Sequence, residues 1–136
     1  MKNVRVGQGI DIHPFTNLPK DFILGGVKIE GVDGLAGHSD ADALTHAICD
    51  AILGALALGD IGTHFSDKDP ENQDRNSMEF LDRSIEMMRN QGWKLGNIDC
   101  TVVTEQPMLK KYIPEMRQNV AKHAKLEINQ VSIKAT

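Results

Sequence analysis

The sequence predicts an α+β domain, of two-layer α/β type, in which helices pack on one face of a mixed β-sheet. Segments typical of strands and helices follow each other in the order strand, helix, helix, strand, helix, strand. Hydrophobic residues make up 40% of the 136 residues, which is enough for a packed core. Because no repeat, charge block or linker-like stretch appears, we expect a single domain over residues 1–136.

A first strand is expected over residues 4–13, where Val and Ile fall on even positions and Gly, Asp and His on odd ones. Pro14 ends this period of two, because proline cannot donate to a strand ladder. Residues 22–29, with Gly25 and Gly26 in the middle, then predict a short hairpin or a kinked pair of strands.

The clearest helix is expected over residues 40–58, where apolar residues recur at the spacing of one buried stripe. Ser39 is its expected N-cap. A second helix is expected to begin after Asn76 and to stop near Gly92, a residue typical of helix ends.

The C-terminal part of the chain predicts one further helix between two strands. Residues 97–104 alternate as a strand does, and Pro107 follows them. The third helix is expected to begin near Pro114, a residue tolerated in a first helical turn. A last strand is expected over residues 130–135.

Composition excludes several classes of protein. The net charge of −4 argues against a nucleic-acid partner, since phosphate backbones require a basic surface. No apolar run approaches the roughly 18 residues that span a bilayer, and the N-terminus does not resemble a signal peptide, so we expect no membrane partner. Cys49 and Cys100 form no CxxC pair, which favours a reducing, cytosolic setting. No transit peptide is recognised, so we expect a bacterial cytoplasm rather than a plastid.

Two polar clusters could bind a metal. Asp11 and His13 lie two apart on the first expected strand, so both side chains leave one face, as half of a transition-metal site or as a surface ion pair. His46 lies one helical turn from Asp42 and from Asp50, so a carboxylate could hold its second ring nitrogen. The alternative for that stripe is a solvated helix face.

His38 precedes the expected start of the long helix, where helix N–H groups would favour an anion such as phosphate. Three loops also carry polar residues, at residues 59–62, 65–70 and 104–108, although each could be a simple connection. The chain has no P-loop and no GxSxG motif, which excludes the common nucleotide-triphosphatase and serine-hydrolase patterns.

Taken together, the motifs resemble the 2-C-methyl-D-erythritol 2,4-cyclodiphosphate synthase family. They run in order over nearly the whole chain: G-x-D-x-H (9–13), GG-V-x-I (25–29), HSD-x-D-x-x-x-H (38–46), L-G-D-I-G (58–62), F-x-D-x-D-P (65–70), L-G-N-I-D (95–99) and I-P-x-M-R (113–117). The resemblance implies an enzyme that cyclises 4-diphosphocytidyl-2-C-methyl-D-erythritol 2-phosphate and releases CMP, in non-mevalonate isoprenoid synthesis.

The resemblance also implies cofactors, assembly and residue roles. Zn²⁺ would be held by Asp11, His13 and His46, and a second ion, Mg²⁺ or Mn²⁺, would bridge the diphosphate. The family forms homotrimers with active sites between neighbouring subunits, and the loop of residues 104–110 receives cytidine from the neighbouring chain. His38 and Thr136 would be catalytic.

The residues expected to contact substrate are Asp11, His13, His38, Ser39, Asp60, Ile61, Gly62, Phe65, Ser66, Asp67, Lys68, Asp69, Thr104, Glu105, Gln106, Pro107, Met108, Leu109, Lys110 and Thr136. The family's final strand lies beyond Thr136, and we expect the ligand of the second ion there too. Met108 stands where many family members have a basic residue, and Ser66 where proline is common.

Two other functions fit the same residues. One is a zinc-dependent phosphohydrolase in which Asp60 activates a water. The other is a non-catalytic module that binds CDP or isoprenoid phosphates. A linear rather than a cyclic diphosphate product would identify the phosphohydrolase. Binding of CDP without turnover would identify the non-catalytic module.

Overall fold

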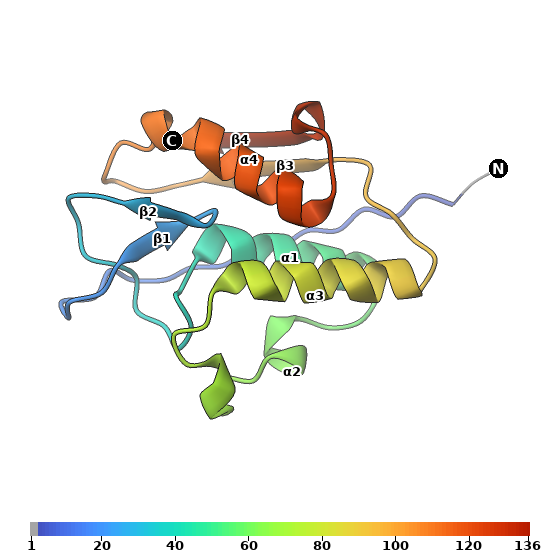
Figure 1. Ribbon diagram of the computed structural model, residues 1–136, viewed down its shortest axis with the longest axis horizontal. Helices are drawn as coiled ribbons and strands as arrows, with labels where there is room; N and C mark the ends of the chain where they lie inside the picture. The colour runs from blue at the N-terminus through green and yellow to red at the C-terminus, as the bar shows by residue number, and fades with distance from the viewer. Residues whose placement is uncertain (1–2) are drawn as a thin grey trace.

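The structure, a computed structural model, describes residues 3–136 (Figure 1). Its elements follow the order β1 (Phe22–Leu24), β2 (Val27–Ile29), α1 (Ala43–Ala55), α2 (Ile61–His64), η1 (Pro70–Asn72), α3 (Ser77–Asn90), β3 (Ile98–Val102), η2 (Lys110–Tyr112), α4 (Ile113–Ala124), η3 (Ile128–Gln130) and β4 (Val131–Ala135). The elements labelled η are single 3₁₀ turns. The α+β class is therefore confirmed.

The strands form two small sheets within residues 3–136, where the sequence predicted one mixed sheet. β1 and β2 pair antiparallel, as the hairpin prediction required. β3 and β4 pair parallel, with Ile98 opposite Val131, and α4 is the crossover that a parallel pair needs. In Figure 1, α1 and α3 lie side by side, and α4 lies across β3 and β4.

Residues 4–13 are the main difference from the predicted fold. They run along α1 but belong to no strand ladder among the described residues. Apolar and polar side chains do alternate along the segment, but the apolar ones face solvent and the polar positions face the helix, the reverse of the usual arrangement. The even-numbered side chains Val4, Val6, Ile10 and Ile12 are 69–90% exposed, while the odd face packs on the helix. A period of two predicts an extended backbone, whereas a ladder also needs a neighbouring strand.

The helices follow their predicted apolar stripes with small shifts at their ends. α1 begins at Ala43, and its N-cap is Asp42, where Ser39 was expected. Asn76 caps α3 as predicted, accepting a hydrogen bond from the backbone N–H of Met78. α3 ends before Gly92, whose φ of +82° suits glycine better than any other residue.

Asp42 joins the hairpin to the first helix. Its side chain is fully buried and accepts hydrogen bonds from the backbone N–H groups of Gly25 (2.9 Å), Gly26 (2.8 Å) and Thr45 (3.0 Å). The Thr45 hydroxyl donates a fourth bond at 2.8 Å. One carboxylate therefore satisfies donors from the β1–β2 turn and from the first turn of α1.

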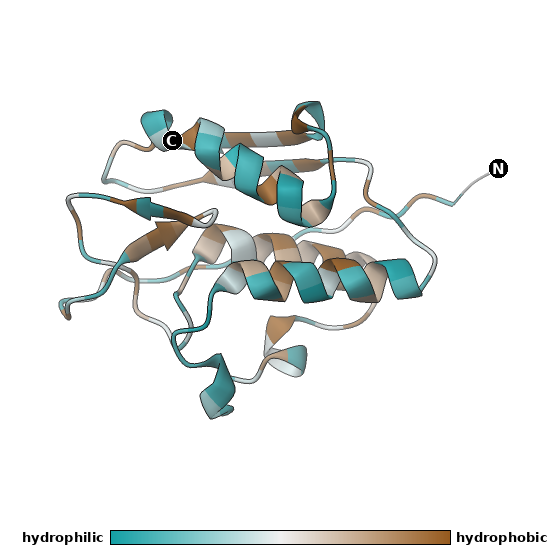
Figure 2. Ribbon diagram, viewed as in Figure 1, coloured by the Kyte–Doolittle hydropathy of each residue, from teal (hydrophilic) through white to brown (hydrophobic). Residues whose placement is uncertain are grey.

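The core lies between α1, α3, α4 and the two sheets. Figure 2 shows polar residues on the outward sides of α3 and α4, with apolar residues concentrated in α1 and the strands. The largest fully buried hydrophobic side chains of the core are Phe22, Ile29, Leu53, Leu81, Ile85, Met116, Val120 and Val131. None of the helices described here combines the length and the apolar composition that a bilayer crossing requires.

We predict that Asp42→Ala lowers the free energy of unfolding by about 3 kcal/mol, because it leaves buried N–H groups without acceptors. Urea denaturation followed by circular dichroism measures this loss. Asp33→Ala, at an exposed position, is the matched control and should unfold like the parent. Equal midpoints for the two variants would contradict the role given to Asp42.

We predict that both cysteines react slowly with thiol reagents in the folded protein. Burial raises the pKa of Cys49 to about 12 and that of Cys100 to about 11. At about pH 8, only about one Cys49 thiol in 10⁴ is then ionised, and the thiolate is the reactive form. Alkylation by iodoacetamide, followed by mass spectrometry, should be slow when native and rapid in denaturant. Prompt native alkylation of Cys49 at that pH would contradict this.

Candidate metal centre and active site

Two glycines allow residues 4–13 to lie directly on α1. A Cβ atom on Gly7 would lie 1.8 Å from the carbonyl oxygen of Ala51. One on Gly9 would lie 1.8 Å from the carbonyl oxygen of Ala47. No side chain fits at either distance, so only glycine permits this approach. The contact brings the next residues of the segment, Asp11 and His13, to the side of α1 that carries His46.

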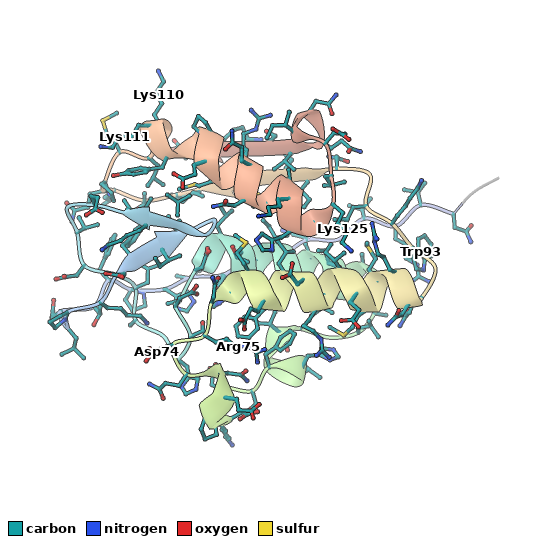
Figure 3. All side chains as sticks on the ribbon, in the orientation of Figure 1. Asp74, Arg75, Trp93, Lys110, Lys111 and Lys125 are labelled. Atoms are coloured by element: carbon teal, nitrogen blue, oxygen red, sulfur yellow. The ribbon has the colours of Figure 1, made fainter. Side chains whose placement is uncertain are left out.

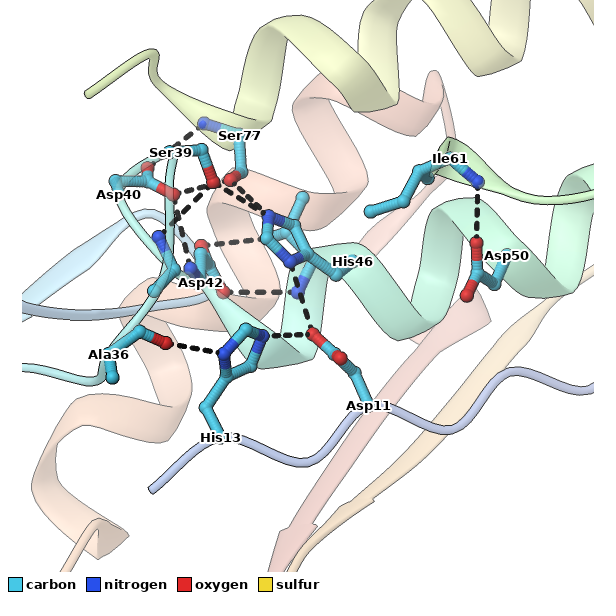
Figure 4. Close-up of polar contacts among 12 residues, drawn as sticks. Asp11, His13, Ala36, Ser39, Asp40, Asp42, His46, Asp50, Ile61 and Ser77 are labelled. Atoms are coloured by element: carbon cyan, nitrogen blue, oxygen red, sulfur yellow. Dashed lines mark hydrogen bonds and ion pairs between the residues drawn. The ribbon is translucent and has the colours of Figure 1, made fainter. Parts of the chain in front are cut away.

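Asp11, His13 and His46 converge on one point (Figure 4). Their ligand-type atoms all lie within 4.8 Å of one another. Asp11 Oδ2 is 2.8 Å from His13 Nε2 and 3.1 Å from His46 Nδ1. These are the atoms that face the shared centre. A segment before the hairpin and the first long helix thus contribute to one site.

Each histidine is held through its other nitrogen. His13 Nδ1 lies 2.7 Å from the carbonyl oxygen of Ala36, to which its N–H donates. His46 Nε2 lies 2.7 Å from Ser77 Oγ and 3.2 Å from Ser39 Oγ. Such contacts orient a ring and leave the opposite nitrogen free to bind a cation.

The electrostatics of the cluster favour charge on Asp11. Partial burial alone would raise the pKa of the Asp11 carboxyl, but the hydrogen bonds from His13 and His46 outweigh it and hold that pKa well below its usual range. The same bond to Asp11 raises the pKa of His13, against the opposing effect of burial. The Asp11 carboxylate is therefore held in its charged form between the two imidazole rings.

The donor set fits a divalent transition metal. One carboxylate oxygen and two imidazole nitrogens are typical ligands of Zn²⁺, and three protein ligands leave room for a substrate atom. The side chains of Asp11, His13 and His46 are 23%, 19% and 8% exposed, so the centre opens to solvent on one side. This arrangement suits a catalytic centre better than a closed structural one.

The two carboxylates that were expected to hold the ring of His46, those of Asp42 and Asp50, accept hydrogen bonds from other groups instead. Asp42 is the buried N-cap described above, and Asp50 Oδ1 accepts the backbone N–H of Ile61 at 2.8 Å. Burial raises the pKa of Asp50. The expectation of a carboxylate one turn from His46 holding its ring is therefore wrong. Ser77, which sequence reasoning missed, takes that place from the start of α3.

His38 is not at a helix N-terminus, contrary to expectation. α1 begins at Ala43, and its first N–H groups are capped by Asp42. His38 instead lies beside the loop that follows α2, with Nε2 3.3 Å from the carbonyl oxygen of Asp69. Ser39 contacts His46, one of the three residues Asp11, His13 and His46 that form the cluster. The two residues thus lie between that cluster and the loop of residues 65–69.

Residues 60–69 form a chain of short turns. Asp60 caps α2, accepting the N–H of Thr63 at 3.0 Å, and Ile61 and Gly62 open that helix. The Phe65 ring stacks on Phe80 at a centroid distance of 4.6 Å. The remaining predicted substrate residues of this loop, Ser66, Asp67, Lys68 and Asp69, are exposed.

The loop of residues 104–110 borders a separate pocket. A cavity of about 710 Å³ is lined by Glu30, Pro107, Met108, Lys110, Lys111 and Tyr112. Figure 3 shows Lys110 and Lys111 at the end of the molecule where α4 begins. Leu109 is only 3% exposed, so its side chain belongs to the core. None of the cluster residues lines this pocket, so within one chain the two predicted parts of the site are apart.

Thr136 follows β4 and continues its backbone hydrogen bonding to β3 and to the residues just after β3. Its N–H donates to the carbonyl oxygen of Val102 at 2.9 Å, and its own carbonyl accepts the N–H of Thr104 at 3.1 Å. Thr104 also donates a side-chain bond to the carbonyl of Gln106 at 2.6 Å. Thr136 is thus joined to the start of the 104–110 loop.

Comparisons with known proteins agree with these motifs. A profile described as the YgbB family matches residues 4–136. A protein from Syntrophomonas wolfei is 49% identical over 98% of this chain and 84% of its own length. One from a Nostoc species is 50% identical over 98% of this chain and 81% of its own. Both are named 2-C-methyl-D-erythritol 2,4-cyclodiphosphate synthase.

Solved structures share the fold. The bifunctional IspDF from Campylobacter jejuni superposes with a TM-score of 0.91 at 39% identity, covering 97% of this chain and 36% of that one. A 2C-methyl-D-erythritol-2,4-cyclodiphosphate synthase in a CDP-bound form gives 0.89 at 29% identity, covering 96% and 87%. A CDP complex of IspF from Plasmodium falciparum gives 0.81 at 34% identity, covering 97% and 80%.

We predict that Gly9→Ala weakens metal binding at the cluster by about tenfold or more, because the added methyl forces Asp11 and His13 away from α1. Zinc affinity, measured by competition with a coloured chelator, tests this. Gly96→Ala is the matched control, since a Cβ there meets no atom within 4 Å. If both variants bind zinc like the parent, the close contact does not position the ligands.

Proposed function

Because the chain belongs to the YgbB family, we propose that it converts 4-diphosphocytidyl-2-C-methyl-D-erythritol 2-phosphate to 2-C-methyl-D-erythritol 2,4-cyclodiphosphate and CMP. It is thus an enzyme of the non-mevalonate route to isoprenoids. The observation that carries the mechanism is the convergence of Asp11, His13 and His46 on one centre. The names of the relatives favour this cyclisation over the alternatives.

The reaction is an intramolecular phosphoryl transfer. An oxygen of the 2-phosphate forms a bond to the β-phosphorus, and the bond from that phosphorus to the oxygen shared with the α-phosphate breaks. CMP leaves with the electron pair. Since the nucleophile is already an anionic phosphate oxygen, the protein has to position two anions and offset their charge.

We assign zinc to Asp11, His13 and His46, whose atoms fit its usual ligands. A zinc ion held by these residues would supply positive charge beside the diphosphate and so favour attack at the β-phosphorus. The Ala36 carbonyl and Ser77 hold the two rings so that the ligand nitrogens face the substrate side. The partial exposure of Asp11 and His13 leaves this side open.

The neighbouring residues are proposed to orient the substrate. His38 and Ser39, between the cluster and the 65–69 loop, would hold the phosphates. Residues 60–62 would contact the methylerythritol hydroxyls, because Asp60 is exposed at the start of α2. Residues 65–69 would cover this part. Thr136 would contact the phosphates from the neighbouring β3–β4 edge.

We propose a homotrimer with active sites between subunits. The pocket at residues 107–112 has the lysines for a CDP diphosphate, yet it is separate from the metal ligands of the same chain. A second subunit would place its 104–110 loop at the cluster of the first. The exposed face of Val4, Val6, Ile10 and Ile12 offers the apolar surface that such an assembly would bury.

A second ion, Mg²⁺ or Mn²⁺, is proposed to offset part of the charge of the diphosphate. Within residues 3–136, Asp11, His13 and His46 make up the one group of three or more potential ligands that converges. The matched stretch spans 84% of the Syntrophomonas relative, so that relative has residues for which this chain shows no counterpart. We place the enzyme in the bacterial cytoplasm, where the free thiols of Cys49 and Cys100 stay reduced.

We predict that His46→Ala abolishes stoichiometric zinc binding and lowers CMP release by about 10³-fold, because two ligands cannot replace three. Metal analysis after dialysis and ³¹P NMR of the products measure both effects. His123→Ala is the matched control, since His123 pairs with Asp82 on the surface, away from the cluster. Full zinc content in His46→Ala would contradict the assigned site.

The same product analysis separates the alternatives. A cyclic diphosphate supports the synthase, whereas CMP with a linear product supports a phosphohydrolase that uses Asp60. Binding of CDP without turnover, with zinc and magnesium supplied, supports a binding module.

A further inference from the structure

We propose that Ser77 and Asp40 are positioning residues that fix the tautomer and orientation of His46, and so set the zinc affinity of the centre. Neither residue was among the predicted site residues. The inference rests on the proposed metal site, but it assigns a new role to a pair that does not touch the metal. The pair lies where the loop before α1 meets the first residue of α3 (Figure 4).

Three side chains form one chain of hydrogen bonds. His46 Nε2 lies 2.7 Å from Ser77 Oγ. The Ser77 hydroxyl also bonds to Asp40 Oδ1, and the Ser77 backbone N–H donates to Asp40 Oδ2 at 2.9 Å. Both carboxylate oxygens of Asp40 are therefore directed at Ser77, which fixes the serine from two sides.

The protons that each group carries decide which one donates in these hydrogen bonds. The Asp40 carboxylate can only accept, so the single hydroxyl proton of Ser77 points to it. Ser77 Oγ is then an acceptor for His46, which must carry a proton on Nε2. With that proton fixed on Nε2, His46 Nδ1 is the nitrogen left for a metal, and a bound cation would replace the proton that Nδ1 shares with Asp11 at 3.1 Å.

Burial leaves no easy substitute for this contact. Ser77 is fully buried and His46 is 6% exposed, so water has little access to Nε2. Ser39 Oγ lies farther from Nε2, at 3.2 Å, and already accepts the N–H of Ala41. A buried N–H deprived of its acceptor costs free energy, which the ring can avoid by turning or changing tautomer.

The pair also links two helices. Asp40 accepts the Ser77 N–H, and the Asp40 N–H donates to the carbonyl oxygen of Arg75 at 3.1 Å. His46 is on α1, whereas Ser77 begins α3. The start of α3 is therefore part of the support of the metal ligand, and a purely structural role has to be distinguished by experiment.

The test compares Ser77→Ala, Ser77→Thr and Asp40→Asn with the parent. We expect Ser77→Ala to weaken zinc binding by about 10- to 100-fold, the usual effect of losing such a support. Ser77→Thr keeps the hydroxyl and should restore binding to within a few fold of the parent. Ser84→Ala is the matched control, because Ser84 is a buried serine of α3 that donates to the carbonyl of Phe80.

Asp40→Asn probes the direction of the chain. An amide can donate to Ser77, whose proton is then free to point at His46 and favour the wrong tautomer. We expect weaker zinc binding and, in long-range ¹H–¹⁵N NMR spectra of the zinc-loaded proteins, a Nε2–H signal for His46 in the parent that is reduced in this variant. Destabilisation of the helix junction alone would not change the tautomer.

The outcomes separate this inference from the proposed function. Zinc binding by the parent together with unchanged affinity in Ser77→Ala overturns the role of the pair and leaves the metal site intact. A Ser77→Ala effect no larger than that of Ser84→Ala does the same. A parent that binds zinc no better than His46→Ala overturns both. If Ser77→Ala does not fold, the affinity and NMR spectra of Asp40→Asn decide the question.

Discussion

The position of the candidate centre depends on how closely residues 4–13 approach α1. Gly7 and Gly9 allow backbone to lie against backbone, at distances where any Cβ would overlap a helix carbonyl oxygen. Two residues further along, Asp11 and His13 reach the side of the helix that carries His46. Since a metal centre tolerates little displacement of its ligands, steric freedom at two glycines controls the chemistry of a carboxylate and two imidazoles.

The loop before α1 divides its acidic residues between two tasks. Asp42 is directed at the hairpin and the start of α1, whereas Asp40, two residues earlier, is directed at the start of α3. Ala41 between them is fully buried and has a φ of +56°, so the backbone turns sharply there. One short loop therefore fixes the hairpin and both long helices around His46.

The sequence was a good guide to the helices and a weaker one to the sheet. Apolar residues at helical spacing located α1, α3 and α4 because each helix buries one stripe in the same core. Alternation in residues 4–13 identified the extended backbone. It could not show whether a partner strand lies beside it, because pairing depends on residues distant in the sequence.

The site shows the same division. Parity placed Asp11 and His13 on one face, but the residues alone gave no reason to bring His46 there, 35 positions from Asp11; that assignment came from the family resemblance. Ser77 is a further 31 positions from His46 and looked like an ordinary residue of a helix start. Short-range rules describe single segments, whereas the support of His46 arises where two segments meet.

The exposed apolar side chains of residues 4–12 create a risk of aggregation for the newly made chain. Four large aliphatic groups alternate along an extended backbone whose amide and carbonyl groups enter no ladder within residues 3–136. Such an edge can template the addition of foreign strands. If the proposed trimer buries this segment, a freshly synthesised subunit exposes it until it assembles, and synthesis that outpaces assembly would lead to insoluble deposits.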